Sequence, residues 1–266
     1  MGRVTARRPV VRITPNGQVR RPDSLAVEEP LEIRVDGSAY SITMRTPGAD
    51  VDLAHGFLSA EGVISGPEDV VLAKHCTDSD LNVLEVTLRA GMVRPVERRN
   101  LPITSACGVC GKESIADVEQ KARWSLPPVE PMVDAATISS LPDRLRAEQR
   151  VFDRTGGLHA AGLFTATGEL LVLREDVGRH NAVDKAIGWA LREGRLPLSS
   201  VILMVSGRAS FELVQKAVLA GIPVLAAVSA PSSLAVDLAV DSGLTLAGFV
   251  RDGSMNLYSH PERVTL

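Results

Sequence analysis

The chain has 266 residues, a formal net charge of −3 and only three cysteines. This length allows one large domain or two small ones, with ample apolar side chains for a core. The small net charge gives no reason to expect nucleic acid or an anionic membrane as a partner. Three cysteines cannot form a disulfide framework, and no apolar run approaches the ~20 residues of a membrane span. These features disfavour a disulfide-rich secreted protein and a membrane protein, and we expect a cytoplasmic one.

The first 28 residues are basic and lack the apolar segment of a secretory signal. Arg7 and Arg8 form a twin-arginine pair, but the apolar stretch after them is short and interrupted. Ala6 occupies the position where myristoylation of Gly2 would require serine or threonine. We therefore expect residues 1–28 to be a disordered basic tail.

Residues 29–105 predict a small N-terminal α+β domain. Four runs of alternating or apolar residues predict strands, and one run with apolar residues at helical spacing predicts a helix. The first two strands flank Asp36-Gly37, a turn sequence typical of a β-hairpin. The expected strands cover residues 31–35, 40–44, 70–73 and 81–88, and the expected helix covers residues 50–61.

Residues 106–135 predict a cysteine loop followed by a connector. Cys107 and Cys110 stand among glycines in the loop, and a short helix is expected over residues 114–124. Three prolines in residues 126–131 block both a helix and a central strand, so this stretch must be a connector.

Residues 136–266 predict an α/β domain that begins with a helix over residues 137–150. Val201–Val205 is fully apolar, as expected of a strand buried on both faces of a parallel sheet. Strands that alternate with helices are typical of an α/β domain with a mainly parallel sheet. The expected strands cover residues 161–165, 170–173, 201–205, 224–228 and 244–250, and a helix follows the second, third and fourth of them.

Polar loops follow four of these strands, and ligands of α/β sheets bind beyond the carboxyl ends of the strands. Three loops each supply an arginine, namely Arg179, Arg208 and Arg251. Three loops also open helices, whose free N–H groups favour an anion. We predict a phosphate-bearing ligand here, although such arginines can equally be solvated or paired with Asp176 or Asp252. No GxGxxG or P-loop motif occurs.

Cys107 and Cys110 form a Cys-x-x-Cys pair, which suits half a zinc site, a redox dithiol or a nucleophilic thiolate. A zinc site would need two more ligands, and His75 and Cys76 are the candidates. Zinc is disfavoured because these two residues are neighbours in or beside a strand, so their side chains would point to opposite faces. A thioredoxin-like pair opens a helix directly after a strand, whereas this pair follows Leu101-Pro102. A glycine-rich loop suits a thiolate that travels to a partner, and a persulfide is a natural cargo for it.

A zinc deaminase is a more specific form of the hypothesis that the cysteines bind a metal. It requires His-x-Glu followed by Pro-Cys-x-x-Cys, with the glutamate as proton shuttle. Here His159 is followed by two alanines, and the cysteines precede the histidine. We therefore expect neither deaminase activity nor tightly bound zinc.

The chain resembles the formate dehydrogenase accessory sulfurtransferase family (FdhD) from about residue 30 to residue 260. The resemblance rests on motifs that follow one another in the right order and that together are highly specific. They cover residues 105–111, 155–161, 174–185, 206–216 and 230–235.

The resemblance implies a cytoplasmic sulfur carrier that takes persulfide sulfur from a cysteine desulfurase. The sulfur would pass to the molybdenum or tungsten cofactor of the formate dehydrogenase catalytic subunit, a bis(molybdopterin guanine dinucleotide). The family fold is a small N-terminal domain plus a cytidine deaminase-like, three-layer α/β domain, usually as a homodimer. The alternative is a non-catalytic chaperone that binds the cofactor or the apo-dehydrogenase, and a weaker one is a degenerate deaminase relative that binds nucleotides.

The resemblance also assigns residues. Cys107 matches the persulfide-bearing cysteine, and Cys110 is expected to assist by relay or resolution. We add His180 and Arg208 to the cofactor site, because both lie in family motifs at predicted strand ends. The family's cofactor-binding segment near the C-terminus matches Phe249, Val250, Arg251, Asp252, Gly253 and Ser254.

Overall fold

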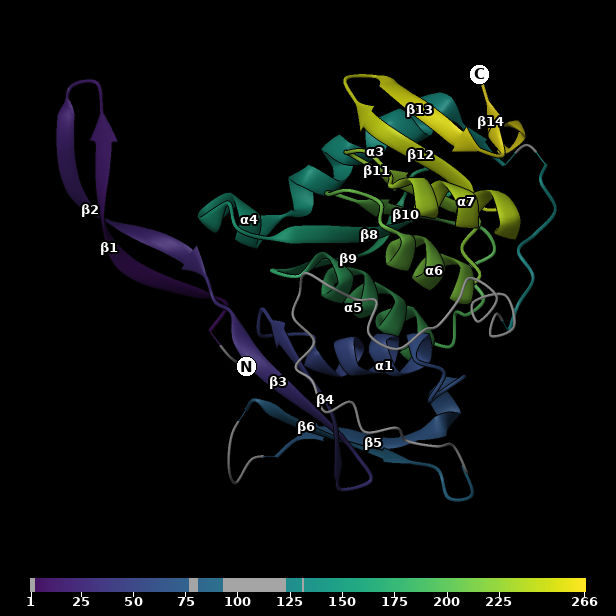
Figure 1. The fold of residues 1–266 in the computed structure, drawn as a ribbon, viewed down its shortest axis with the longest axis horizontal. Helices are drawn as coiled ribbons and strands as arrows, with labels where there is room; N and C mark the ends of the chain where they lie inside the picture. Colours follow the sequence, from purple (N-terminus) through teal and green to yellow (C-terminus); the bar gives the residue numbers. More distant parts are fainter. Residues whose placement is uncertain (1–2, 77–80, 93–122, 131) are drawn as a thin grey trace.

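The computed structural model describes residues 3–76, 81–92, 123–130 and 132–266. Figure 1 shows a long hairpin arm, a small sheet with one helix, and a larger α/β body. The strands of the arm and the small sheet are β1 (Thr5–Thr14), β2 (Gly17–Ala26), β3 (Glu29–Val35), β4 (Ser38–Arg45), β5 (Val70–His75) and β6 (Val83–Leu88). Those of the body are β7 (Val133–Asp134), β8 (His159–Thr165), β9 (Leu170–Asp176), β10 (Val201–Val205), β11 (Val224–Ala227), β12 (Thr245–Arg251), β13 (Ser254–Ser259) and β14 (Val264–Thr265). The α-helices are α1 (Asp50–Ala60), α3 (Ala135–Glu148), α4 (Arg150–Thr155), α5 (Arg179–Arg192), α6 (Phe211–Leu219) and α7 (Ser233–Ser242).

The N-terminal arm corrects the expectation of a disordered tail over residues 1–28. Strands β1 and β2 pair antiparallel, from Thr5 opposite Ala26 to Thr14 opposite Gly17. Valine, isoleucine and threonine recur along β1 and favour an extended backbone. Gly17 closes the turn with a φ of 117°, a conformation that glycine adopts readily. The many arginines obscured this pattern in the sequence.

The small sheet has the strand order β4-β3-β6-β5 and is covered by α1. Its core contains Leu31 and Ile33 from β3 and Leu53 and Phe57 from α1, all buried. The four strands and the helix expected within residues 29–105 are therefore confirmed, with bounds that shift by one or two residues at most ends.

Helix α1 joins the small sheet to the body through α5. A Cβ atom added to Gly56 would collide with the backbone carbonyl of Asp184, and one added to Gly188 would collide with that of Asp52. The two helices thus approach backbone to backbone, which only glycine permits at these two positions.

The large sheet has the order β13-β12-β11-β10-β8-β9. Only β10-β11 and β11-β12 pair in parallel, whereas β8 pairs antiparallel with both β10 and β9, and β13 pairs antiparallel with β12. The expectation of a mainly parallel sheet is therefore wrong, and the sheet is mixed. Strand β12 is also not the last strand, because the chain turns back at residues 252–253 into β13.

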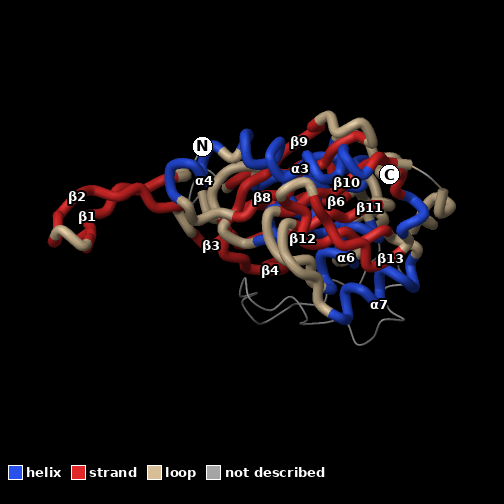
Figure 2. The backbone as a smooth tube through the Cα atoms, turned by 90° about the horizontal axis from the view of Figure 1, so that it is seen from above, coloured by secondary structure: helices blue, strands red, loops and turns tan. Residues whose placement is uncertain are grey.

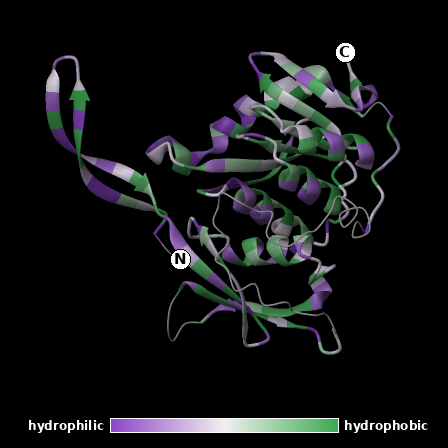
Figure 3. Ribbon diagram, in the orientation of Figure 1, coloured by the Kyte–Doolittle hydropathy of each residue, from purple (hydrophilic) through white to green (hydrophobic). Residues whose placement is uncertain are grey.

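Helices cover both faces of the large sheet and give the expected three-layer α/β architecture (Figure 1). On one face, α5, α6 and α7 pack on the core cluster that includes Leu203 and Leu225. On the other, α3 packs on the cluster that includes Ile202 and Met204. All five residues of β10 are buried, as the apolar run predicted. Figure 3 shows the hydrophobic residues gathered along the central strands and the helix faces that cover them.

The cysteine loop and the helix expected over residues 114–124 lie almost entirely outside the described residues. The described residues of the proline connector, 126–130, form neither helix nor strand, as expected. No helix within the described ranges is long and apolar enough to cross a membrane.

Candidate functional site

The carboxyl ends of β9, β10, β11 and β12 meet at one edge of the large sheet. Backbone hydrogen bonds join the loops there: Ser229 N donates to Gly207 O at 3.3 Å, and Phe249 N donates to Ser229 O at 3.3 Å. Ala209 N also donates to Ala230 O at 3.3 Å. Three loops predicted to form a site therefore make one continuous platform, which we call the sheet edge.

His180 is held at this edge by an ion pair. It lies in the first turn of α5, and its Nε2 atom is 2.5 Å from Oε2 of Glu212 in the first turn of α6. Ser210 Oγ lies 3.4 Å from the same nitrogen. The hydrogen bond to His180 lowers the pKa of Glu212, against an opposing effect of burial. The structure thus keeps Glu212 ionised and fixes the imidazole.

The arginines of the edge form no ion pairs within the part of the chain that the structure describes, although the charge of Arg179 helps to lower the pKa of the nearby Glu212. Arg179 is half-buried, and its Nε atom is buried without a hydrogen-bond partner there. Arg208 is exposed, and Arg251 lies over the ring of Phe249 at 5.8 Å. The pairing of these arginines with Asp176 or Asp252, which the sequence left open, does not occur. An anion is the natural partner for donors arranged in this way.

His159 belongs to the site and was not predicted. It opens β8, whose amino end lies at the edge because β8 runs antiparallel to β10. Burial, and then the nearby charges of Arg179 and His180, lower the pKa of His159, with a smaller effect from Arg208. Since these effects require proximity, His180 and Arg208 are brought together around His159. The neutral ring can hydrogen-bond a ligand near neutral pH.

A cavity of about 610 Å³ opens beside His159, on the side of α3 and α4. Ser206 and Val228 contribute from the sheet edge, and Gln149 and Phe152 from the helices. Gln149 is only 3% exposed, and none of the hydrogen bonds among the described residues uses its side-chain amide. The cavity is of a size that holds a small organic ligand. An aromatic wall and a buried amide suit a flat, polar ring.

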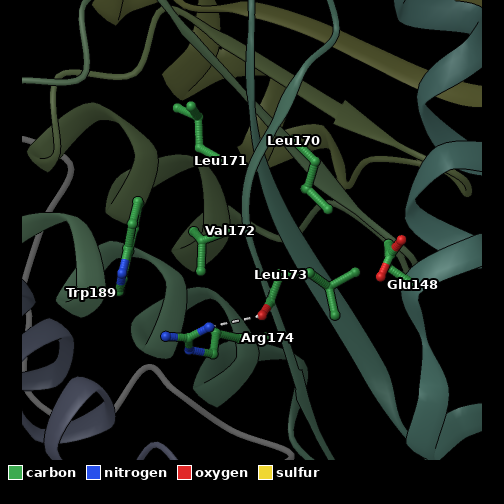
Figure 4. A pocket seen from close by; sticks show the side chains of 7 residues that line it. All are labelled: Glu148, Leu170, Leu171, Val172, Leu173, Arg174 and Trp189. Atoms are coloured by element: carbon green, nitrogen blue, oxygen red, sulfur yellow. Dashed lines mark hydrogen bonds between the residues drawn. The ribbon is translucent and has the colours of Figure 1, made fainter.

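A second cavity, of about 430 Å³, lies along the edge strand β9 and is shown in Figure 4. Its charged groups are already engaged: Arg174 pairs with Asp52 at 2.7 Å, and Glu148 lies 3.8 Å from Arg150. Arg174 also donates to Leu173 O at 3.0 Å (Figure 4). We therefore do not count this groove as a ligand site.

The residues of the longest family motif, 174–185, have two different roles. Asp176 is fully buried, pairs with Lys185 at 2.6 Å and accepts a hydrogen bond from Asn181 at 3.1 Å. It also accepts from Thr46 N at 3.1 Å, so these residues tie the loop to the small domain. The residues between them, Arg179 and His180, are thereby presented to the edge.

The C-terminal segment predicted to bind cofactor is only partly at the edge. Phe249 joins the platform through Ser229, and its φ of 52° marks a strained backbone for a residue other than glycine. Val250 is fully buried in the core beneath α3, so its side chain does not face the sheet edge, and its assignment to the ligand site stays a prediction. The other residues, Arg251, Asp252, Gly253 and Ser254, form the exposed tip of the β12-β13 hairpin.

Cys107 and Cys110 lie outside the described residues, so their assignment stays a prediction. Cys76 is a free, half-buried cysteine that follows β5. Among the described residues, no group of three or more His, Cys, Asp or Glu side chains is placed to hold a metal ion. The predicted absence of tightly bound zinc stays a prediction.

These features define an α/β protein with a basic sheet edge suited to phosphate and a cavity beside it. The chain belongs to the FdhD/NarQ family, because the sequence model of that family matches residues 26–265. This finding confirms the resemblance found in the motifs.

Relatives of known name agree with this placement. The chain is 58% identical to the "Sulfur carrier protein FdhD" of Nocardia farcinica, over 99% of this chain and 96% of that protein. It is 56% identical to the protein of the same name from Streptomyces avermitilis, over 100% and 98% of the two chains. A crystal structure described as a formate dehydrogenase accessory protein from Desulfotalea psychrophila matches with a TM-score of 0.78 and 26% identity, over 99% of this chain and 100% of that one.

Proposed function

We propose that this protein is a cytoplasmic sulfur carrier. It takes sulfur from a cysteine desulfurase as a persulfide on Cys107 and delivers it to the bis(molybdopterin guanine dinucleotide) cofactor, with molybdenum or tungsten, of a formate dehydrogenase. The observation that carries this proposal is family membership over nearly the whole chain, in a family whose relatives are named sulfur carriers, together with the Cys107-x-x-Cys110 pair.

Loading requires no net oxidation. The thiolate of Cys107 attacks the outer sulfur of the desulfurase persulfide, and a new S–S bond forms at Cys107 Sγ. The S–S bond of the donor breaks, and the donor cysteine leaves as a thiolate. Lys112, five residues beyond Cys107 in the chain, can favour the anionic forms.

Delivery as sulfide requires two electrons, and Cys110 can supply them. Its thiolate attacks Cys107 Sγ, and a disulfide forms between the two cysteines. The outer sulfur leaves as hydrosulfide with the electron pair of the broken bond and passes to the metal. A thiol reductant then restores the dithiol for the next cycle.

The sheet edge supports the cofactor part of the proposal. Arg179 and Arg208 have no carboxylate partner among the described residues and suit the phosphates of a guanine dinucleotide. His159 lines the cavity of about 610 Å³ and is near enough to both arginines for their charges to lower its pKa, and Gln149 and Phe152 of the same cavity suit a planar base. The cofactor would thus be bound as cargo at the edge, and the protein would work as a homodimer.

Activation of the client enzyme separates a carrier from a chaperone. The dehydrogenase is isolated from cells that lack the carrier and is then incubated with persulfide-loaded protein and assayed for formate oxidation. A carrier restores activity, and the Cys107→Ala protein does not. If Cys107→Ala protein restores full activity, the protein acts as a cofactor-binding chaperone and the sulfur-transfer proposal fails.

A further inference from the structure

The β1-β2 arm lies almost entirely before the residues that the family model matches. The family match begins at residue 26, where the arm ends. Figures 1 and 2 show the arm projecting from the body along the longest axis of the molecule. At its base, Ala26 lies near Gly157. A two-stranded hairpin that is isolated in water is marginally stable at best, so a partner surface would stabilise it.

One face of the arm is apolar and basic, without acidic residues. Side chains that are directly opposite in an antiparallel pair share a face, and alternate residues along each strand share it too. Val11 and Ile13, which are 51% and 80% exposed, lie on this face. Arg20 pairs with Val11 in the register, and Arg7 lies four residues before Val11, toward the base. We call the face formed by Arg7, Pro9, Val11, Ile13 and Arg20 the arm face.

The charge of the chain is divided between arm and body. Residues 1–28 contain six of the 29 basic residues and two of the 32 acidic ones, so their formal charge is +4. Residues 29–266 retain 23 basic and 30 acidic residues, a formal charge of −7. The arm is therefore complementary to the body of its own protein.

Helix α7 carries the matching surface. Leu234 and Val240 are 42% and 50% exposed, and Asp237 and Asp241 are also exposed. At 100° per residue these four side chains fall on one side of the helix, opposite the buried Ala235 and Ala239. Neither aspartate forms an ion pair with another described residue. This surface, the α7 face, combines apolar and acidic groups, whereas the arm face combines apolar and basic groups.

The two faces cannot meet within one molecule. Figures 1 and 2 place the arm and α7 at opposite ends of the longest axis. Contact therefore requires a second copy of the chain. If each arm reaches the other copy, the two contacts are equivalent and close a two-fold dimer.

We propose that the arm face of each protomer docks on the α7 face of the other, and that this exchange holds the homodimer together. The inference specifies the homodimer of the proposed function, but it does not depend on sulfur transfer. Exposed valine and isoleucine side chains are covered in the contact, and Arg7 and Arg20 meet Asp237 and Asp241.

Charge reversal on the full-length protein tests this contact. Sedimentation equilibrium is measured for Arg7→Glu/Arg20→Glu, the arm variant, and for Asp237→Lys/Asp241→Lys, the α7 variant. Each should weaken the dimer at least about tenfold, because like charges then face each other. Lys74→Glu/Arg89→Glu, with two exposed charges reversed at the small sheet, should dimerise as the wild type does. Circular dichroism and thermal unfolding confirm that each variant is folded.

Mixing the two variants gives the sharpest result. In a heterodimer the reversed arm meets the reversed α7 face, and the native arm meets the native α7 face, so both contacts are attractive again. Native mass spectrometry should show heterodimers of the arm and α7 variants, whereas each variant alone should be mainly monomeric. Homodimers of the arm variant with wild-type affinity would overturn the contact and leave a dimer held elsewhere. A wild-type protein that stays monomeric at micromolar concentration would overturn the dimer as well.

Discussion

His159, Arg179 and His180 show how single side chains create a site that no single motif reveals. They come from β8 and from the first turn of α5, and the pKa of His159 is lowered by burial and by the two neighbouring positive groups. Glu212 pairs with His180, so the positive charge of the edge rests mainly on Arg179 and Arg208. A phosphate group bound here would pair with Arg179 and Arg208, which form no ion pair with another described residue.

The charge of Arg208 should decide the affinity for phosphorylated ligands. Calorimetry with GDP, which represents the guanosine end of the cofactor, should show about ten- to a hundredfold weaker binding to Arg208→Ala. This corresponds to the loss of one charge-assisted contact, roughly 1.5–3 kcal/mol. Free guanosine, without phosphate, should bind both proteins equally, and Arg150→Ala should bind GDP as the wild type does. Equal GDP affinity of wild type and Arg208→Ala would remove Arg208 from the site.

The ion pair of Glu212 and His180 should give a pH-dependent contribution to stability. Folding lowers the pKa of Glu212, so the carboxylate stabilises the fold at pH values above its ordinary pKa of 4.5. This contribution is lost as the pH falls through the lowered pKa. Urea unfolding of the wild type and Glu212→Gln should therefore differ near pH 6 and converge at more acidic pH. A difference that stays constant down to that acidic range would rule out this ionisation as its source.

At the scale of elements, the contact between α1 and α5 fixes the small domain on the body. Gly188 lies against the backbone of α1, so an added methyl group must push the two helices apart. We expect Gly188→Ala to lower the free energy of unfolding by about 3 kcal/mol or more. Gly157→Ala is the matched control, because its Cβ would meet Ala26 at an ordinary 3.7 Å. Chemical denaturation compares them, and equal stability of both variants would show that the helices can separate without cost.

The sequence predicted most elements of the body because their apolar periodicity is strong. The runs in β10 and α5 have few charges on their buried faces and leave little ambiguity. It failed for β1 and β2, because arginines interrupt their apolar residues and the pairing becomes clear only when both strands are seen together. It failed also for the antiparallel pairing of β8 with β10, since a strand that pairs antiparallel in a mixed sheet has the same local pattern as a parallel one.

The sequence predicted only those residues of the candidate site that lie in a polar motif after a predicted strand. Arg208 and His180 stood out because they follow strands within polar motifs. His159 and Glu212 were missed, since their roles depend on contacts between residues far apart in the chain. Val250 was predicted with its neighbours as one segment, but adjacent residues of a strand face opposite sides and its side chain points into the core. An alternation rule applied to β12 would have separated it from Phe249.

At the scale of the whole molecule, the proposal combines a sulfur-bearing loop with a cofactor-binding edge and a dimerising arm. The three parts differ in sequence position and in chemistry, so each can be disabled without altering the others. Variants of the arm should leave persulfide formation intact, and variants of the edge should leave both dimerisation and persulfide formation intact. The sulfur-bearing loop is the part on which the proposed function depends most.

The most direct test is site-resolved mass spectrometry after incubation with a cysteine desulfurase and cysteine. We predict that the wild type gains one sulfur atom that dithiothreitol removes, and that the Cys107 peptide carries it. Cys76→Ala, which removes the one cysteine outside the loop, should gain sulfur as the wild type does. Cys107→Ala should gain none, and Cys110→Ala should still load. Full sulfur gain by Cys107→Ala with none by Cys110→Ala would reverse the two roles, and full gain by both variants would contradict the carrier mechanism.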